Sequence, residues 1–118
     1  MSEVSKSLMR TFHSLIDHGV DGLIDCLETR KHESALDDFT DEDNRILETI
    51  SLTNEQLGVV RKLAREAGKL TVFGILCVID GVSYANMEIP DLALVNRETK
   101  EDIAEKFLHD EFVEQTAD

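Results

Sequence analysis

The 118 residues include 25 acidic and 12 basic side chains, which gives a formal net charge of −13, and 42% of the residues are hydrophobic. This length suits one domain with its own core, so the sequence predicts a single domain over residues 1–118. The apolar content excludes a disordered acidic tail. The charge disfavours binding to nucleic acid or to an anionic membrane surface, whereas a basic protein partner would be attracted.

The negative charge is concentrated at the two ends of the sequence. Residues 1–51 and 82–118 each sum to −7, whereas residues 52–81 sum to +1. The first ten residues, MSEVSKSLMR, lack the apolar segment of a secretory signal, so we expect a cytoplasmic protein. Cys26 and Cys77 both lie in apolar helical runs, and we expect reduced core thiols rather than a disulfide.

Residues 3–28 are predicted to be helical, because apolar side chains recur there at three- and four-residue steps. Gly19 and Gly22 weaken the middle of this segment, so a kink or two shorter helices meeting near residues 18–21 also fits. The expected buried face consists of Val4, Leu8, Phe12, Leu15, Ile16, Leu23 and Leu27.

A row of polar residues follows the other face of the same segment at four-residue steps: His13, Asp17, Asp21 and Asp25. Neighbouring side chains on a helix can share a metal ion, but carboxylates in metal sites normally converge from more than one element. The row is also typical of a solvated acidic face. We therefore expect no metal site and no cofactor.

The segment 29–40 breaks the periodicity and is predicted to be a loop. Thr40 can then cap a short helix from Asp41 to about Ser51, with an expected buried edge of Ile46, Leu47 and Ile50. Five acidic residues crowd this helix start: Asp37, Asp38, Asp41, Glu42 and Asp43.

This acidic run is not a calcium loop of the EF-hand type. If Asp37 were the first ligand, Phe39 would occupy a ligand position and Glu42 would stand where glycine is needed. The run is then either a generic solvated helix start or half of an interface for a basic protein.

Residues 53–80 are predicted to form a long central helix around which the other elements pack. Thr53 and Gln56 have the spacing of a capping box, and Gly81 can close the helix in the left-handed conformation. From Leu70 onward the sequence TVFGILCVI is apolar on almost every side, so other elements should surround it. A strip of small residues predicts close approach by a neighbouring helix: Ala64, Ala67, Gly68, Thr71 and Gly74.

Two alternatives stay open in the second half of the sequence. The β-branched content of residues 71–79 also suits a strand. After a short apolar run at residues 92–95, the pattern fits either a helix capped by Thr99 or a turn at residues 96–101. In the second case a returning strand and a short terminal helix from Leu108 follow the turn.

The segments VFGILCVIDGV (72–82), LALVN (92–96) and LHDEF (108–112) together resemble a type of small, helix-rich and largely uncharacterised bacterial protein. Some of these proteins belong with the immunity proteins of bacterial toxin systems. The resemblance implies a β-hairpin at residues 92–107, and it offers no active site to carry over.

Catalytic motifs are not evident. His109 and Asp110 have the composition of an oriented base, but neither cysteine lies in the electropositive surroundings that favour a thiolate nucleophile. The sequence also lacks an HExxH motif and a glycine-rich phosphate loop. We expect a protein that is not an enzyme.

These observations predict a mainly α fold around the central helix, with a small C-terminal β-hairpin as an addition. The predicted function is that of an acidic binding protein that neutralises a basic partner, most concretely an immunity protein for a nuclease-like toxin. The alternative is a self-associating structural or regulatory protein, such as a homodimer. The expected partner-binding residues are Asp37, Asp38, Asp41, Glu42 and Asp43, with Asp17, Asp21 and Asp25.

Overall fold

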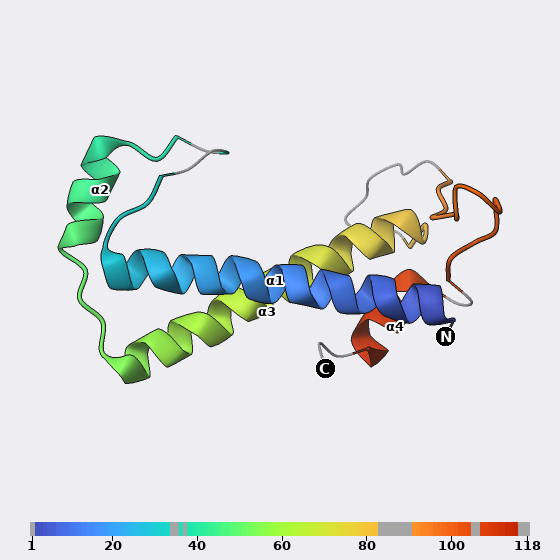
Figure 1. The fold of residues 1–118 in the computed structure, drawn as a ribbon, viewed down its shortest axis with the longest axis horizontal. Helices are drawn as coiled ribbons and strands as arrows, with labels where there is room; N and C mark the ends of the chain where they lie inside the picture. Colours follow the sequence, from blue (N-terminus) through green and yellow to red (C-terminus); the bar gives the residue numbers. More distant parts are fainter. Residues whose placement is uncertain (1, 34–35, 37, 83–90, 105–106, 116–118) are drawn as a thin grey trace. The chain divides into compact units, whose positions relative to one another are not determined.

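The computed structural model describes residues 2–33, 36, 38–82, 91–104 and 107–115, and Figure 1 labels the helices found among them. They are α1 (Glu3–Thr29), α2 (Asp41–Glu48), α3 (Asn54–Ile79) and α4 (Leu108–Glu114). The predicted mainly α fold is therefore confirmed. The chain divides into two compact units, which we call the α4 unit (residues 1–16 and 67–118) and the α2 unit (residues 17–66).

The two ends of α3 follow the local signals in the sequence. The Thr53 N–H donates to the Gln56 side chain at 2.8 Å, and the Gln56 N–H donates to the Thr53 hydroxyl at 3.1 Å. At the other end Gly81 has a φ of 74°. Its N–H donates to the Val78 carbonyl, while the Val82 N–H donates to the Cys77 carbonyl. This is a Schellman motif, in which glycine avoids the cost of a left-handed backbone. The helix, and not the alternative strand, is the structure of residues 71–79.

The helix α1 runs without interruption through Gly19 and Gly22, so the kink considered near residues 18–21 is absent. Its buried face also differs from the expected one, because Val4, Leu15 and Leu23 are exposed. The buried residues of α1 are Ser5, Met9, His13, Ile16, Val20 and Ile24.

The core of the α4 unit joins α1, α3 and α4. Its fully or nearly fully buried apolar side chains are Met9, Ile16, Leu76, Cys77, Leu108 and Phe112. The helix α1 approaches α3 most closely at Gly68, where a Cβ atom would lie 2.7 Å from Ile16 Cγ2. The expected close approach at the small-residue strip is thus confirmed at Gly68, whereas a Cβ at Gly74 would meet nothing within 4 Å.

The apolar second half of α3 packs with α1 and α4, but its side chains are not all buried. Leu76 and Cys77 are buried, but Leu70 and Ile75 are 61% and 55% exposed. The helix α4 is seven residues long. The remaining apolar side chains of this half, Val72, Phe73, Val78 and Ile79, are half-buried.

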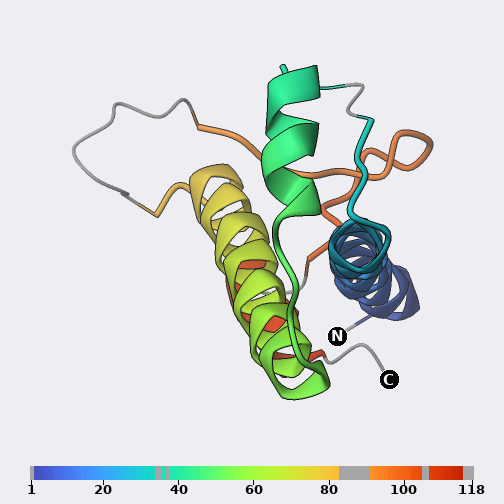
Figure 2. The same cartoon turned by 90° about the vertical axis from the view of Figure 1, so that its left-hand side faces the viewer.

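The α2 unit combines the end of α1, the helix α2 and the start of α3 (Figure 2). Thr40 caps α2 as predicted, in a reciprocal capping box with Asp43. The helix ends at Glu48, three residues earlier than expected, and only Leu47 of the predicted buried edge is buried. Ile46 is exposed because such a short helix presents a single row of side chains to its neighbours, and Ile50, which is also exposed, lies beyond the end of the helix.

The predicted β-hairpin is not formed by the described residues. Residues 92–104 contain one antiparallel bridge, between Val95 and Asp102, around a turn at residues 97–99. The Ile103 N–H donates to the Leu94 carbonyl at 3.0 Å, but one bridge is too short to make strands. A terminal helix does begin at Leu108, as the turn alternative required.

None of the helices in the described ranges has the length and apolar content needed to cross a membrane.

Candidate functional site

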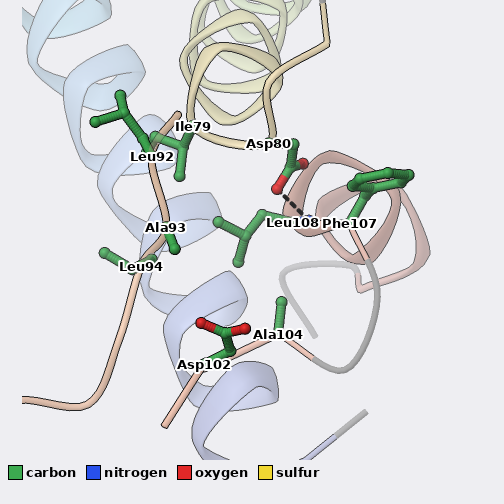
Figure 3. A pocket seen from close by; sticks show the side chains of 9 residues that line it. All are labelled: Ile79, Asp80, Leu92, Ala93, Leu94, Asp102, Ala104, Phe107 and Leu108. Atoms are coloured by element: carbon green, nitrogen blue, oxygen red, sulfur yellow. Dashed lines mark hydrogen bonds between the residues drawn. The ribbon is translucent and has the colours of Figure 1, made fainter. Parts of the chain in front are cut away.

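The carboxylate of Asp80, which follows the last residue of α3, is the acceptor for the start of α4 (Figure 3). The Leu108 and His109 backbone N–H groups donate to its two oxygens at 3.0 and 2.8 Å, and His109 Nδ1 lies 2.5 Å from it. The His109 ring also has an edge contact with Phe73 and stacks on Phe107. Because Phe107 supplies no side-chain cap, Asp80 satisfies N–H groups that the first turn of a helix leaves free.

A cavity of about 370 Å³ lies beside this junction, and Figure 3 shows the side chains that line it. Most of its lining side chains are apolar; Leu92 lies beside Ile79 at the end of α3, and Ala104 lies farther from that helix. The two carboxylates at the cavity are Asp80, which is already bonded to α4, and Asp102, which is exposed. The cavity therefore offers a mainly apolar space with little free polar functionality.

The His109 environment does not match the base that the sequence suggested. The ring nitrogen Nδ1 pairs with Asp80, while Asp110 lies 3.6 Å from Nε2. Cys77 is a candidate nucleophile in the same unit, but burial raises the pKa of its thiol, and the Asp80 and Asp110 carboxylates raise it further. A protonated thiol is a poor nucleophile. The geometry of this junction accordingly supports an anchor for α4.

Two further contacts attach α4 to α1, and the sequence did not reveal them. The Ser5 hydroxyl donates to the Glu111 carboxylate, and both residues are fully buried. His13 Nε2 lies 2.9 Å from the Phe112 carbonyl oxygen, and the two rings stack with centroids 4.1 Å apart. His13 is thus a buried packing residue and not part of an acidic row.

Two of the predicted partner-binding residues form ion pairs inside the α2 unit. Arg65 Nε donates to Asp17 Oδ1 at 3.0 Å, and Arg61 Nη1 donates to Asp21 Oδ1 at 2.5 Å. These pairs link α1 to α3 and neutralise the two carboxylates locally. Exposed ion pairs of this kind contribute about 0–1 kcal/mol.

The other predicted partner-binding residues differ in their exposure and in the contacts that they make. Asp43 is committed to the capping box of α2. Asp25, Asp41 and Glu42 are exposed and make no ion pair with any described residue. Asp38 is also exposed. Asp37 lies outside the described residues.

Two cavities lie side by side in the α2 unit, close to these acidic residues. The first, of about 560 Å³, is mainly apolar and includes Leu23, Phe39 and Leu47 in its lining. The second, of about 550 Å³, is polar. Its charged lining residues are Asp25, Lys31, Glu33 and Glu48. Cys26 and His32 line both cavities, and their Sγ and Nδ1 atoms are 3.1 Å apart.

His32, which lies between α1 and α2 and lines both cavities, is hydrogen-bonded to α2. Asn44 of α2 accepts a hydrogen bond from the His32 N–H at 2.9 Å and donates one to the His32 carbonyl at 3.1 Å. The His32 ring has an edge contact with Phe39, with centroids 4.9 Å apart. His32 is therefore fixed to α2, and its ring contacts Phe39 at the wall of the apolar cavity.

The described residues contain no group of three or more His, Cys, Asp or Glu side chains arranged to hold a metal ion. Comparison with known protein families, with curated proteins and with solved structures finds no match for this chain.

Proposed function

We propose that this chain is an acidic binding protein that captures and neutralises a basic protein partner, and that it serves as an immunity protein for a toxin. The observation that carries the proposal is the negative charge at Asp25, Asp41 and Glu42, which have no counterion among the residues that the structure describes. These residues belong to the stretch 25–48, which holds nine acidic and three basic residues.

The mechanism is electrostatic capture followed by local contact. A toxin that acts on nucleic acid needs lysine and arginine side chains to bind phosphate. Carboxylates on this chain can pair with the same side chains and so block access to the substrate. Complementary charge raises the association rate, and apolar contacts nearby determine how slowly the complex dissociates.

A charge-reversal experiment tests the proposal. The tagged protein would be used to capture partners from the native lysate, including the product of the neighbouring gene, and association with the captured basic protein would then be timed. The test variant carries Asp25→Lys, Asp41→Lys and Glu42→Lys. Its matched control carries Glu55→Lys, Glu66→Lys and Glu98→Lys, which change the net charge equally at other exposed positions.

We expect association of the test variant to be at least about tenfold slower at low salt, with a much smaller change in the control. Equal rates for the two variants would remove the assignment to this surface. A captured partner without excess positive charge would contradict the proposed function itself. Asp43 is left unchanged because its substitution would damage the cap of α2.

A second candidate function is self-association, and the exposed aliphatic side chains of α3 favour it. Val59 and Leu63 are exposed in the α2 unit, as are Leu70 and Ile75 in the α4 unit. Exposed apolar surface of this kind commonly marks an interface. Light scattering over a range of concentrations distinguishes the candidates, because a monomer at high concentration contradicts the homodimer.

A further inference from the structure

The apolar cavity of the α2 unit has an unusual wall, because two glycines in the interior of α1 line it. A Cβ atom at Gly19 or at Gly22 would meet nothing within 4 Å. Each glycine lowers helix stability by about 1 kcal/mol relative to alanine. Packing within the unit does not account for that cost, since no neighbour approaches either position. The glycines instead leave the cavity wide.

The side chains around the cavity mouth have the mixed exposure of a binding surface. Leu23 and Phe39 are 43% and 38% exposed, while Leu47, which also lines the cavity, is buried. The volume of about 560 Å³ lies within the range of pockets that accept a bulky side chain or a small ligand. Partly exposed apolar groups around an open pocket are typical of the centre of a protein interface.

The neighbouring polar cavity adds a charge preference. Asp25, Glu33 and Glu48 outnumber the single cation Lys31 in its lining. Cys26 and His32 belong to both linings, so a group that fills the apolar cavity stands next to these carboxylates. The cavity pair therefore presents an apolar pocket with negative charge on one side.

We propose that this cavity pair is the anchor site for a basic polypeptide segment. An aliphatic or aromatic side chain of the segment enters the apolar cavity, and an adjacent lysine or arginine reaches Asp25, Glu33 and Glu48. The inference rests on the proposed function, and it adds the place and the chemistry of the contact. Burial of one large apolar side chain contributes about 1.5–3 kcal/mol, which suits a single anchor.

Charge selects this occupant over the others. A second copy of the chain would bring a further net charge of −13 to an acidic surface, and an anionic membrane would be repelled in the same way. A small neutral apolar ligand would leave the carboxylates beside it without a counterion. A basic segment satisfies the pocket and the carboxylates together.

Three short fluorescent peptides test the proposal by anisotropy at low and high salt. The first alternates lysine and serine around one central leucine. The second replaces that leucine by alanine, and the third replaces the lysines by serine and keeps the leucine. Each is titrated with the wild-type chain, with Gly22→Leu, whose side chain occupies the cavity, and with Gly58→Leu. Gly58 is a matched control because it lies in the interior of α3 with nothing within 4 Å of its Cβ position.

We expect the leucine–lysine peptide to bind the wild-type chain about tenfold more tightly than either relative, and Gly22→Leu alone to abolish that advantage. Both leucine variants should keep or raise thermal stability, since leucine is the better helix former. Equal binding of the leucine and alanine peptides would overturn the anchor site while leaving a basic partner in place. If the peptide in which serine replaces the lysines bound as tightly as the leucine–lysine peptide, the site would be an apolar pocket without preference for a basic segment. No binding of any peptide by a chain that still captures a basic protein would also overturn the inference.

Discussion

The side-chain amide of Asn44 in α2 makes two hydrogen bonds with the backbone of His32. Its Oδ1 accepts from the His32 N–H, and its Nδ2 donates to the His32 carbonyl. This pairing fixes His32, whose ring contacts Phe39 at the wall of the apolar cavity of the α2 unit. A loop without such contacts would have to be ordered during binding, and the ordering would weaken the complex.

Replacement of Asn44 by alanine should lower the free energy of unfolding by about 1–2 kcal/mol, because two partly buried backbone groups lose their partners. Hydrogen exchange at His32 should accelerate more than exchange in the interior of α1. Asn54→Ala, at the exposed start of α3, is the control and should leave both quantities unchanged. An unaltered exchange rate at His32 in the Asn44 variant would contradict the claim that Asn44 fixes the His32 backbone.

Replacement of Asp80 by alanine should detach the start of α4. Removing the shared acceptor leaves the Leu108 and His109 N–H groups unsatisfied, and we expect a loss of about 2–3 kcal/mol in urea unfolding. Asp110→Ala removes a more exposed carboxylate and should cost less than about 0.5 kcal/mol. Combining Asp80→Ala with His109→Ala should cost less than the sum of the two single losses. Full additivity would show that the two side chains act independently.

Replacement of Gly68 by alanine should destabilise the α4 unit, although alanine is the better helix former. The new methyl group would lie 2.7 Å from Ile16 Cγ2, and overpacking of a core costs about 1–3 kcal/mol. Gly74→Ala is the matched control, since it meets nothing within 4 Å and should raise stability by up to about 1 kcal/mol. Thermal unfolding of the two variants should therefore shift in opposite directions. A shift in the same direction would refute the close contact.

The two cysteines should differ in reactivity. Cys26 is half-buried at the cavity wall, whereas Cys77 is buried and the pKa of its thiol is raised. We expect iodoacetamide to modify Cys26 first at neutral pH, with Cys77 reacting only at more alkaline pH or after unfolding. Mass spectrometry of digested samples at several pH values measures both rates. Equal rates in the folded protein would contradict the burial of Cys77.

The same pKa shift predicts a change of stability in alkali. The folded protein holds the Cys77 proton more tightly than the unfolded chain, whose thiol has a pKa of about 8.5. The resulting stabilisation is complete below that pH and is lost as the pH rises through the folded-state pKa. Urea unfolding between neutral and alkaline pH should show this decline in the wild-type chain and a smaller one in Cys77→Ala. If stability fell equally with pH in the wild-type chain and in Cys77→Ala, the decline would not come from the Cys77 thiol.

The features that the sequence predicted well are those that depend on neighbouring residues. The cap at Thr40, the capping box at Thr53 and the left-handed Gly81 use partners within a few positions. The buried face of α1 was predicted one step out of register because Ser5 and His13 are polar. Their partners on α4 lie 106 and 99 residues away, and no local pattern reveals them.

The candidate site was predictable only as an excess of charge. The sequence shows every carboxylate, but not that Arg61 and Arg65 neutralise Asp21 and Asp17 from another helix. The apolar cavity was equally hidden, because Gly19 and Gly22 looked like helix breakers. Their role as a cavity wall depends on Phe39 and Leu47, which line the same cavity from outside α1.

The contact between Ser5 and Glu111 joins nearly the first and nearly the last described residues of the chain, and it has a consequence for synthesis. A nascent chain displays the face of α1 that carries Met9 and His13 long before α4 has been translated. Ribosome-bound chains of increasing length should resist proteolysis in the α4 unit only after residue 114 has emerged, and earlier protection would disprove this order. Until residue 114 has emerged, the α1 face is exposed and can be bound by chaperones. Packing of the short α4 then completes the core of the α4 unit.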